Sequence, residues 1–103
     1  MVMQPIRRKL FCLGRLVATP GAIQALAQAH DDPLTFIEAH RRGDWGDVGP
    51  DDARLNDEAV AHEGDPDQQS RVLSAYTTSA GKRIYIITEA DRSATTILLP
   101  EEY

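Results

Sequence analysis

The chain has 103 residues, which suits one domain, because two domains of half that length would each bury too little apolar surface to be stable. Its 11 lysines and arginines against 16 aspartates and glutamates give a formal net charge of −5, which disfavours general binding to nucleic-acid phosphates. Hydrophobic residues at 42% and charged residues at 26% lie near globular averages and disfavour disorder. We predict a basic N-terminal tail over residues 1–9 and a single domain over residues 10–103.

The single cysteine and the lack of a long apolar run both bear on the compartment. Cys12 has no cysteine partner within the chain, which suits a reducing cytosol. The apolar run over residues 10–13 is interrupted by Gly14 and Arg15, so it is too short for a signal peptide. No stretch approaches the roughly 18 apolar residues of a membrane span. We therefore expect a cytoplasmic protein with no membrane segment.

The first expected element is a strand over residues 10–18. Its residues are mostly apolar, and it is interrupted at Gly14, where a glycine tolerates the irregular backbone of a bulge. Cys12 falls within this strand, so its thiol is expected to be an inert core group rather than a nucleophile.

Two helices should follow, and each begins with the same signal. Thr19 and Asp32 are good N-cap residues, and the proline after each suits the first helical position, where no backbone N–H is needed. The first helix is expected over about residues 19–29, and the second is expected to end at Gly43.

A third helix is expected between Pro50 and Gly64. The two aspartates after Pro50 favour the positive N-terminal end of a helix. Leu55, Ala59 and Val60 are spaced to face inward.

The last third of the chain predicts strands over residues 72–78, 83–88 and 94–99, which are rich in β-branched and aromatic residues. The short connections between them, over 79–81 and 90–93, suit hairpin turns. The predicted fold class is α+β: an N-terminal strand, two to three helices, and then a three-stranded antiparallel meander.

Charge is concentrated in the middle of the chain. From Asp44 to Asp67 there are nine acidic residues and a single basic one, Arg54, which gives a local charge of −8. One interpretation is a solvated acidic helix with its loops, because surface charge mainly serves solubility. The other is a negative surface that docks on a basic protein partner.

The only tryptophan, Trp45, lies between two glycines and two aspartates just after the second predicted helix. It would be either a core side chain of a structural loop or an exposed anchor for a partner, as tryptophans often are at interfaces. The candidate partner-binding residues are Asp44, Trp45, Asp47, Asp51, Asp52, Asp57 and Glu58.

A second polar group surrounds the last predicted turn and consists of Glu89, Asp91, Arg92, Ser93, Thr95 and Thr96. These residues would either bind a small anion or perform acid–base chemistry, or they would form an ordinary solvated hairpin turn. The three histidines lack the spacing of a helical zinc site, so we expect no metal and no cofactor.

Several stretches of the chain carry a family resemblance: Leu13 to Ala22, Arg42 to Gly46, Leu55 to Ala59, Ile87 to Thr96, and Leu99 to Tyr103. Together they resemble a family of small uncharacterised bacterial proteins that are often carried on plasmids and integrated elements. Some members are labelled as a type I restriction methylase subunit. That label does not suit this chain, because an adenine methyltransferase needs a nucleotide-binding glycine loop and an Asn-Pro-Pro-aromatic motif, and neither is present.

Two functional hypotheses remain. The first is a non-enzymatic interaction module of a mobile genetic element, which docks a protein partner through its acidic middle segment and blunts a defence system such as restriction or CRISPR. The second is a toxin–antitoxin component with an arrangement similar to the RelE-type ribonucleases, acting on RNA or the ribosome. Its basic candidates are Arg71, Lys82, Arg83 and Arg92.

The sequence favours a binding protein over an enzyme and leaves that question undecided. It also leaves open a homodimer formed by edge-to-edge pairing of the sheet.

Overall fold

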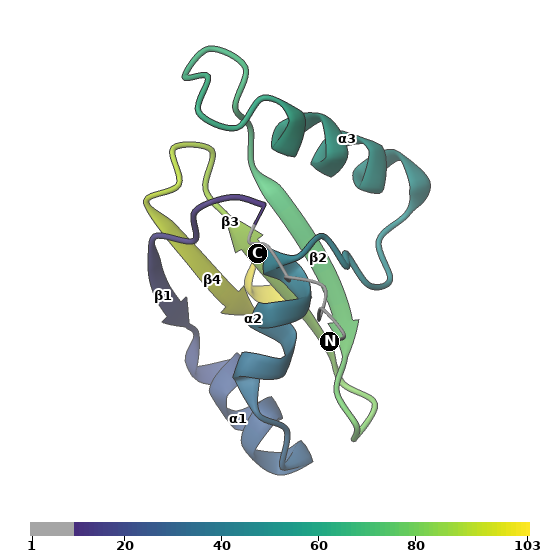
Figure 1. Cartoon of the computed structure of the whole chain (residues 1–103). Helices are drawn as coiled ribbons and strands as arrows, with labels where there is room; N and C mark the ends of the chain where they lie inside the picture. Colours follow the sequence, from purple (N-terminus) through teal and green to yellow (C-terminus); the bar gives the residue numbers. More distant parts are fainter. Residues whose placement is uncertain (1–9) are drawn as a thin grey trace, which may run out of the picture.

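The computed structural model describes residues 10–103, and the predicted basic tail over residues 1–9 lies outside them. Figure 1 shows the elements, which are β1 (Arg15–Ala18), α1 (Pro20–Ala29), α2 (Pro33–Arg41), α3 (Pro50–Ala61), β2 (Val72–Thr77), β3 (Arg83–Thr88), β4 (Ala94–Leu98) and a short 3-10 helix, η1 (Pro100–Glu102). The α+β class and all three helices are therefore confirmed.

The four strands form one mixed sheet in the order β1-β4-β3-β2. Strands β2, β3 and β4 are antiparallel neighbours, as predicted, but the meander does not stand alone. Strand β1 joins it beside β4 and runs parallel to it, with the N–H of Arg15 donating to the oxygen of Ser93 and the N–H of Thr19 donating to that of Ile97, both at 3.0 Å. The predicted three-stranded antiparallel meander is thus only part of a four-stranded mixed sheet. The pairing of the N-terminal strand with β4 was not predicted, because a parallel partner far away in the chain leaves no local signal in either strand.

The first strand is shorter than predicted. Residues 10–14 lie outside β1, because Gly14 turns the chain with a φ of 65°. A Cβ at Gly14 would lie 2.4 Å from the carbonyl oxygen of Arg92, so only glycine fits this approach to the β3–β4 turn. Cys12 precedes this turn and is exposed, so the prediction of a buried strand thiol is also wrong.

The helix starts follow the predicted capping chemistry. Thr19 Oγ1 accepts a hydrogen bond from the N–H of Ala22 at 3.2 Å, and Asp32 Oδ1 accepts one from the N–H of Leu34 at 2.9 Å. Helix α3 begins after Gly49 with no side-chain cap, and two aspartates in its first turn complement the helix dipole instead.

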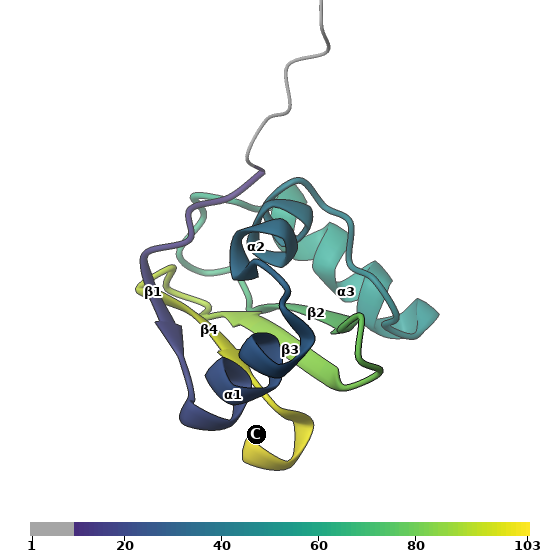
Figure 2. The same ribbon diagram turned by 90° about the horizontal axis from the view of Figure 1, so that it is seen from below.

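Helices α1 and α2 lie over one face of the sheet, and α3 lies beside β2 (Figures 1 and 2). The main core fills the space between these two helices and the sheet and contains Ala22, Leu26, Ile37, Ala39, Tyr76, Ile84, Ile86 and Ile97. A second cluster of Phe11, Trp45, Ala59 and Val72 joins α3 to the end of this core. Among residues 10–103, no helix has the length and apolar character needed to span a membrane.

Candidate functional site

Two acidic residues of α3, Asp51 and Glu58, lie on the outer face of that helix. Asp51, Glu58 and the intervening Leu55 recur at spacings of three and four residues, so they share one side, and all three are exposed. Glu58 pairs with Arg54 at 3.0 Å, whereas Asp51 and Asp52 have no side-chain hydrogen bond or ion pair within residues 10–103. The first turn of α3 therefore presents the unpaired carboxylate of Asp51 on the outer face, whereas Asp52 is half-buried and lies on the side of Asn56, towards the start of β2.

Leu55 was expected to face inward, and this prediction is wrong: its side chain is 47% exposed. It lines a shallow hollow of about 190 Å³ between α3 and the start of β2, together with Asp52 and Arg71. The inward position belongs instead to Asn56, which is 2% exposed. An apolar side chain thus lies between Asp51 and Glu58 on the outer face of α3, with Asp52 and Arg71 beside it.

Asn56 is turned inward because it completes the hydrogen bonding of the edge strand β2. Its Nδ2 donates to the carbonyl oxygen of Leu73 at 2.7 Å, and its Oδ1 accepts from the N–H of Leu73 at 3.0 Å. The two hydrogen bonds from a buried amide to these backbone groups stabilise the fold more than burial of Leu55 in the same place would. The helical pattern alone did not reveal this, because the partner strand follows eleven residues after the helix ends.

Trp45 is a core residue with only 8% of its surface exposed. It packs against Phe11 and His40, at ring-centroid distances of 6.1 and 6.0 Å. Its Nε1 donates to Asp57 Oδ1 at 3.1 Å, so Asp57 holds the indole in place. The proposed exposed anchor is therefore corrected, and the alternative of a structural loop holds, because a ring of this size buries its area most effectively where α3 meets the sheet.

Asp44 and Asp47 belong to the same structural loop. The N–H of Asp47 donates to the carbonyl oxygen of Ala75 at 2.7 Å, and Asp47 Oδ2 accepts from Thr77 Oγ1 at 3.3 Å. The carbonyl oxygen of Asp44 accepts from the Tyr76 hydroxyl, and the Asp44 carboxylate accepts from the N–H of Gly46. Both side chains are exposed, but their loop is bound along the edge of β2.

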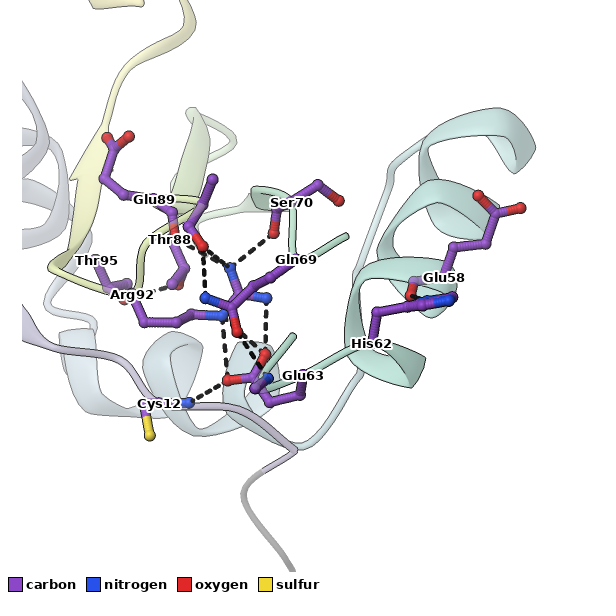
Figure 3. Close-up of polar contacts among 12 residues, drawn as sticks. Cys12, Glu58, His62, Glu63, Gln69, Ser70, Thr88, Glu89, Arg92 and Thr95 are labelled. Atoms are coloured by element: carbon purple, nitrogen blue, oxygen red, sulfur yellow. Dashed lines mark hydrogen bonds and ion pairs between the residues drawn. The ribbon is translucent and has the colours of Figure 1, made fainter. Parts of the chain in front are cut away.

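The polar group at the β3–β4 turn separates into inward and outward members. Glu89, Asp91 and Ser93 are exposed, and Asp91 accepts from the N–H of Ser93 at 2.9 Å. Hydrogen bonding from the Ser93 side chain, and secondly from this N–H, lowers the pKa of Asp91. Thr96 is half-buried on the sheet face opposite α1 and α2. Arg92 and Thr95 are buried and point into the protein, as Figure 3 shows for Arg92. The six residues do not converge on one solvent-accessible site.

Arg92 connects segments that are far apart in the sequence. Its guanidinium lies 2.8 Å from Glu63 Oε1 through Nη2, and Nη1 donates to the carbonyl oxygens of Ser70 at 2.7 Å and Glu89 at 3.0 Å. Glu63 also accepts from the N–H of Cys12 at 3.2 Å. One charged pair, Arg92 and Glu63, therefore joins four parts of the chain: the segment at Cys12, the end of α3, the start of β2 and the β3–β4 turn (Figure 3).

A buried row of polar side chains crosses the core beside Arg92. His40 Nδ1 lies 2.6 Å from Ser74 Oγ, and His40 Nε2 lies 2.9 Å from Thr88 Oγ1. Thr88 Oγ1 lies 2.7 Å from Thr95 Oγ1, which donates to the carbonyl oxygen of Leu13 at 2.7 Å. These residues lie on separate elements, so no pattern in the sequence indicates that they meet.

The donor and the acceptor of each hydrogen bond in this row follow from the bond between Thr95 and the carbonyl oxygen of Leu13. Because Thr95 donates to a carbonyl, it must accept from Thr88, and Thr88 must in turn accept from His40. His40 therefore carries its proton on Nε2 and accepts the Ser74 hydroxyl on Nδ1. Burial, and secondly the nearby charge of Arg92, lower the pKa of His40 to about 3, so the ring is neutral near pH 7.

The Ser74–His40 contact has the distance of a nucleophile–base pair, but neither side chain has exposed surface. A substrate in solution cannot reach them, so the row supports the core. Within residues 10–103, no three His, Cys, Asp or Glu side chains are grouped so that they could hold a metal ion.

The four basic residues of the ribonuclease hypothesis also have separate environments. Arg71 is exposed, Lys82 lies 3.4 Å from Glu101, and Arg83 donates to the carbonyl oxygen of Asp47 at 3.2 Å. Arg92 is buried against Glu63. A phosphate in solution would therefore not meet all four.

Comparison of the chain with protein-family models, curated proteins and solved structures finds no match.

Proposed function

We propose that this protein is a non-enzymatic interaction module that binds a basic segment of a partner protein through the outer face of α3. The observation that carries the proposal is the unpaired, exposed carboxylate of Asp51 beside the exposed Leu55, together with the half-buried Asp52, which lines the same hollow as Leu55. Acidic side chains attract and orient a basic partner, and a central apolar side chain supplies burial.

The proposed contact surface leaves out two of the candidate residues, Trp45 and Asp57. Trp45 is in the core and Asp57 holds its indole, so neither is free to contact a partner with its full side chain. The proposed contact residues are Asp51, Asp52, Leu55 and Glu58. The partner would carry lysine or arginine residues around one apolar side chain that fits beside Leu55.

The family resemblance supplies the biological setting of this proposal. If the chain is carried on a mobile element, a partner encoded by the host or by the element would suit it, and blunting of a defence system is the role we propose. Such a role needs binding alone and requires no catalytic group.

The test is capture of partners from lysate of the native host with wild-type protein and with a variant in which Asp51, Asp52 and Glu58 are changed to Lys. Asp57 is left unchanged because of its bond to Trp45. We expect the wild type to retain one stoichiometric partner, which high salt removes and the variant does not bind, since charge attraction between exposed groups is screened by salt.

A matched control changes Asp67, Glu89 and Glu101 to Lys, which alters the net charge equally at exposed positions away from the outer face of α3. This control should bind as the wild type does, whereas Leu55→Ala should weaken binding without loss of the fold. Equal binding by the α3 variant and the wild type would contradict the proposal. Circular dichroism establishes that each variant is folded.

A further inference from the structure

The two edges of the sheet differ in whether their outward backbone groups are hydrogen-bonded. At the β2 edge, both backbone groups of Leu73 are bonded to Asn56, and those of Ala75 are bonded to the loop at Trp45 and Asp47. This edge is therefore closed to another strand. Strand β1 forms the other edge, and Figure 2 shows no element of residues 10–103 beyond it.

The backbone groups that β1 turns outward can be identified from its bonds to β4. The N–H of Arg15 donates to Ser93, just before β4, and the N–H of Thr19, just after β1, donates to Ile97 of β4, so the backbone groups of odd-numbered residues face that strand. The N–H and C=O groups of Leu16 and Ala18 then point away from the sheet. None of these four groups makes a hydrogen bond within residues 10–103.

The open edge is also apolar. The side chain of Leu16 is 50% exposed, that of Val17 is 38% exposed, and that of Leu34 on α2 is 56% exposed. Leu16, Val17 and Leu34 line a hollow of about 190 Å³ together with Pro33, Ile37 and Ile97. Open strand edges with exposed apolar residues favour pairing with another strand.

We propose that the occupant of this edge is β1 of a second copy of the chain, paired antiparallel about a two-fold axis at Val17. The geometry favours a second copy because the edge is self-complementary. In this register Leu16 of each copy faces Ala18 of the other, and the four outward groups of each strand form four hydrogen bonds in total. A large side chain meets a small one at both positions, on the side of the sheet where Leu34 lies.

The axis position gives the proposal a sharp test. Val17 of one copy would lie opposite Val17 of the other as a non-hydrogen-bonded pair, with Cα atoms about 4.5 Å apart. Like charges placed there repel and opposite charges attract. Val17→Lys and Val17→Glu should each weaken self-association by about tenfold or more, and an equimolar mixture of the two should restore it.

The measurement is sedimentation equilibrium over a range of protein concentrations, for the wild type, each variant and the mixture. We expect the wild type to reach the mass of a dimer at high concentration. Ala61→Lys, an exposed position on α3, is the control and should associate as the wild type does. Amide exchange provides a second readout: the Leu16 and Ala18 amides should gain protection with concentration, whereas the Val17 amide is protected throughout.

Three results would overturn the proposal. If the wild type stays monomeric at all concentrations, β1 does not pair with a second copy. A dimer that persists equally in Val17→Lys uses another surface. Failure of the mixed variants to associate, with both folded by circular dichroism, excludes the two-fold axis at Val17. The outer face of α3 lies across the molecule from β1, so these results are independent of the proposed partner binding (Figure 2).

Discussion

At the scale of single residues, Arg92 makes side-chain contacts with several separate segments of residues 10–103. It adopts a φ of 61°, which few residues other than glycine tolerate, and this backbone conformation directs its guanidinium inward. Inside, it meets Glu63, and it also lies 5.6 Å from the centre of the Phe11 ring. A strained backbone is thus held by an ion pair, backbone carbonyls and a cation–π contact.

We expect Arg92→Ala to lower the free energy of unfolding by about 3–5 kcal/mol, because it leaves Glu63 and the carbonyl oxygens of Ser70 and Glu89 without their donor. Urea denaturation measures the change. Arg83→Ala serves as the control, since Arg83 is exposed, and it should cost less than about 1 kcal/mol. Equal losses in the two variants would mean that the buried pair has no special role.

At the scale of elements, α3 is attached to the sheet through its contacts with β2 and the neighbouring loops. Ala59 packs against Val72, Asn56 bonds to the backbone of Leu73, and Asp57 accepts from Trp45. These contacts come from the inner face of α3 and leave its acidic outer face free. The same helix therefore closes one sheet edge and presents the proposed binding surface.

We expect Asn56→Ala to destabilise the protein by about 2–3 kcal/mol, since both backbone groups of Leu73 lose their partner. It should also increase aggregation, because the β2 edge becomes open to other strands. Urea denaturation and light scattering test the two effects. Asp57→Asn is the matched control, because an amide oxygen can still accept from Trp45. Unchanged stability of Asn56→Ala would show that Asn56 does not secure the edge.

At the scale of the whole molecule, the buried row at His40 couples stability to pH. The folded state holds the pKa of His40 at about 3, below the ordinary value of 6.5, so the unfolded chain binds more protons between these values. Stability is therefore full above about pH 6.5 and falls as the pH is lowered towards 3.

We expect the free energy of unfolding to fall by about 2 kcal/mol between pH 7 and pH 5 as a result of His40. The carboxylates of Asp31, Asp91 and Glu102 have lowered pKa values through their hydrogen bonds, so their contributions are lost at lower pH. Urea denaturation at half-unit pH steps measures the profile. A flat profile between pH 7 and pH 5 would contradict a neutral, buried His40 in the folded state.

The two proposed surfaces also combine at this scale. Strand β1 and helix α3 lie on opposite sides of the molecule, so pairing through β1 would leave the outer faces of both α3 helices free (Figures 1 and 2). A dimer of this form would present two acidic surfaces and would bind a partner with repeated basic segments more tightly than one copy does.

Local signals in the sequence determined the helices and the meander. The pairs Thr19–Pro20 and Asp32–Pro33 specify two helix starts through capping bonds that span only a few residues. Strands β2, β3 and β4 are joined by short turns, so their pairing also follows from neighbouring sequence.

The tertiary structure decided the features that depend on contacts between distant segments. Three features depend on partners elsewhere in the chain. They are the pairing of β1 with β4, the inward position of Asn56 in place of Leu55, and the burial of Trp45 and Arg92. The sequence does not distinguish a polar side chain in solvent from one that is hydrogen-bonded in the core. The free energy of burying such a side chain depends on whether a bonding partner is present there. The acidic composition was thus evident from the sequence, while the arrangement of the chain decided which carboxylates of residues 10–103 are bonded and which are exposed.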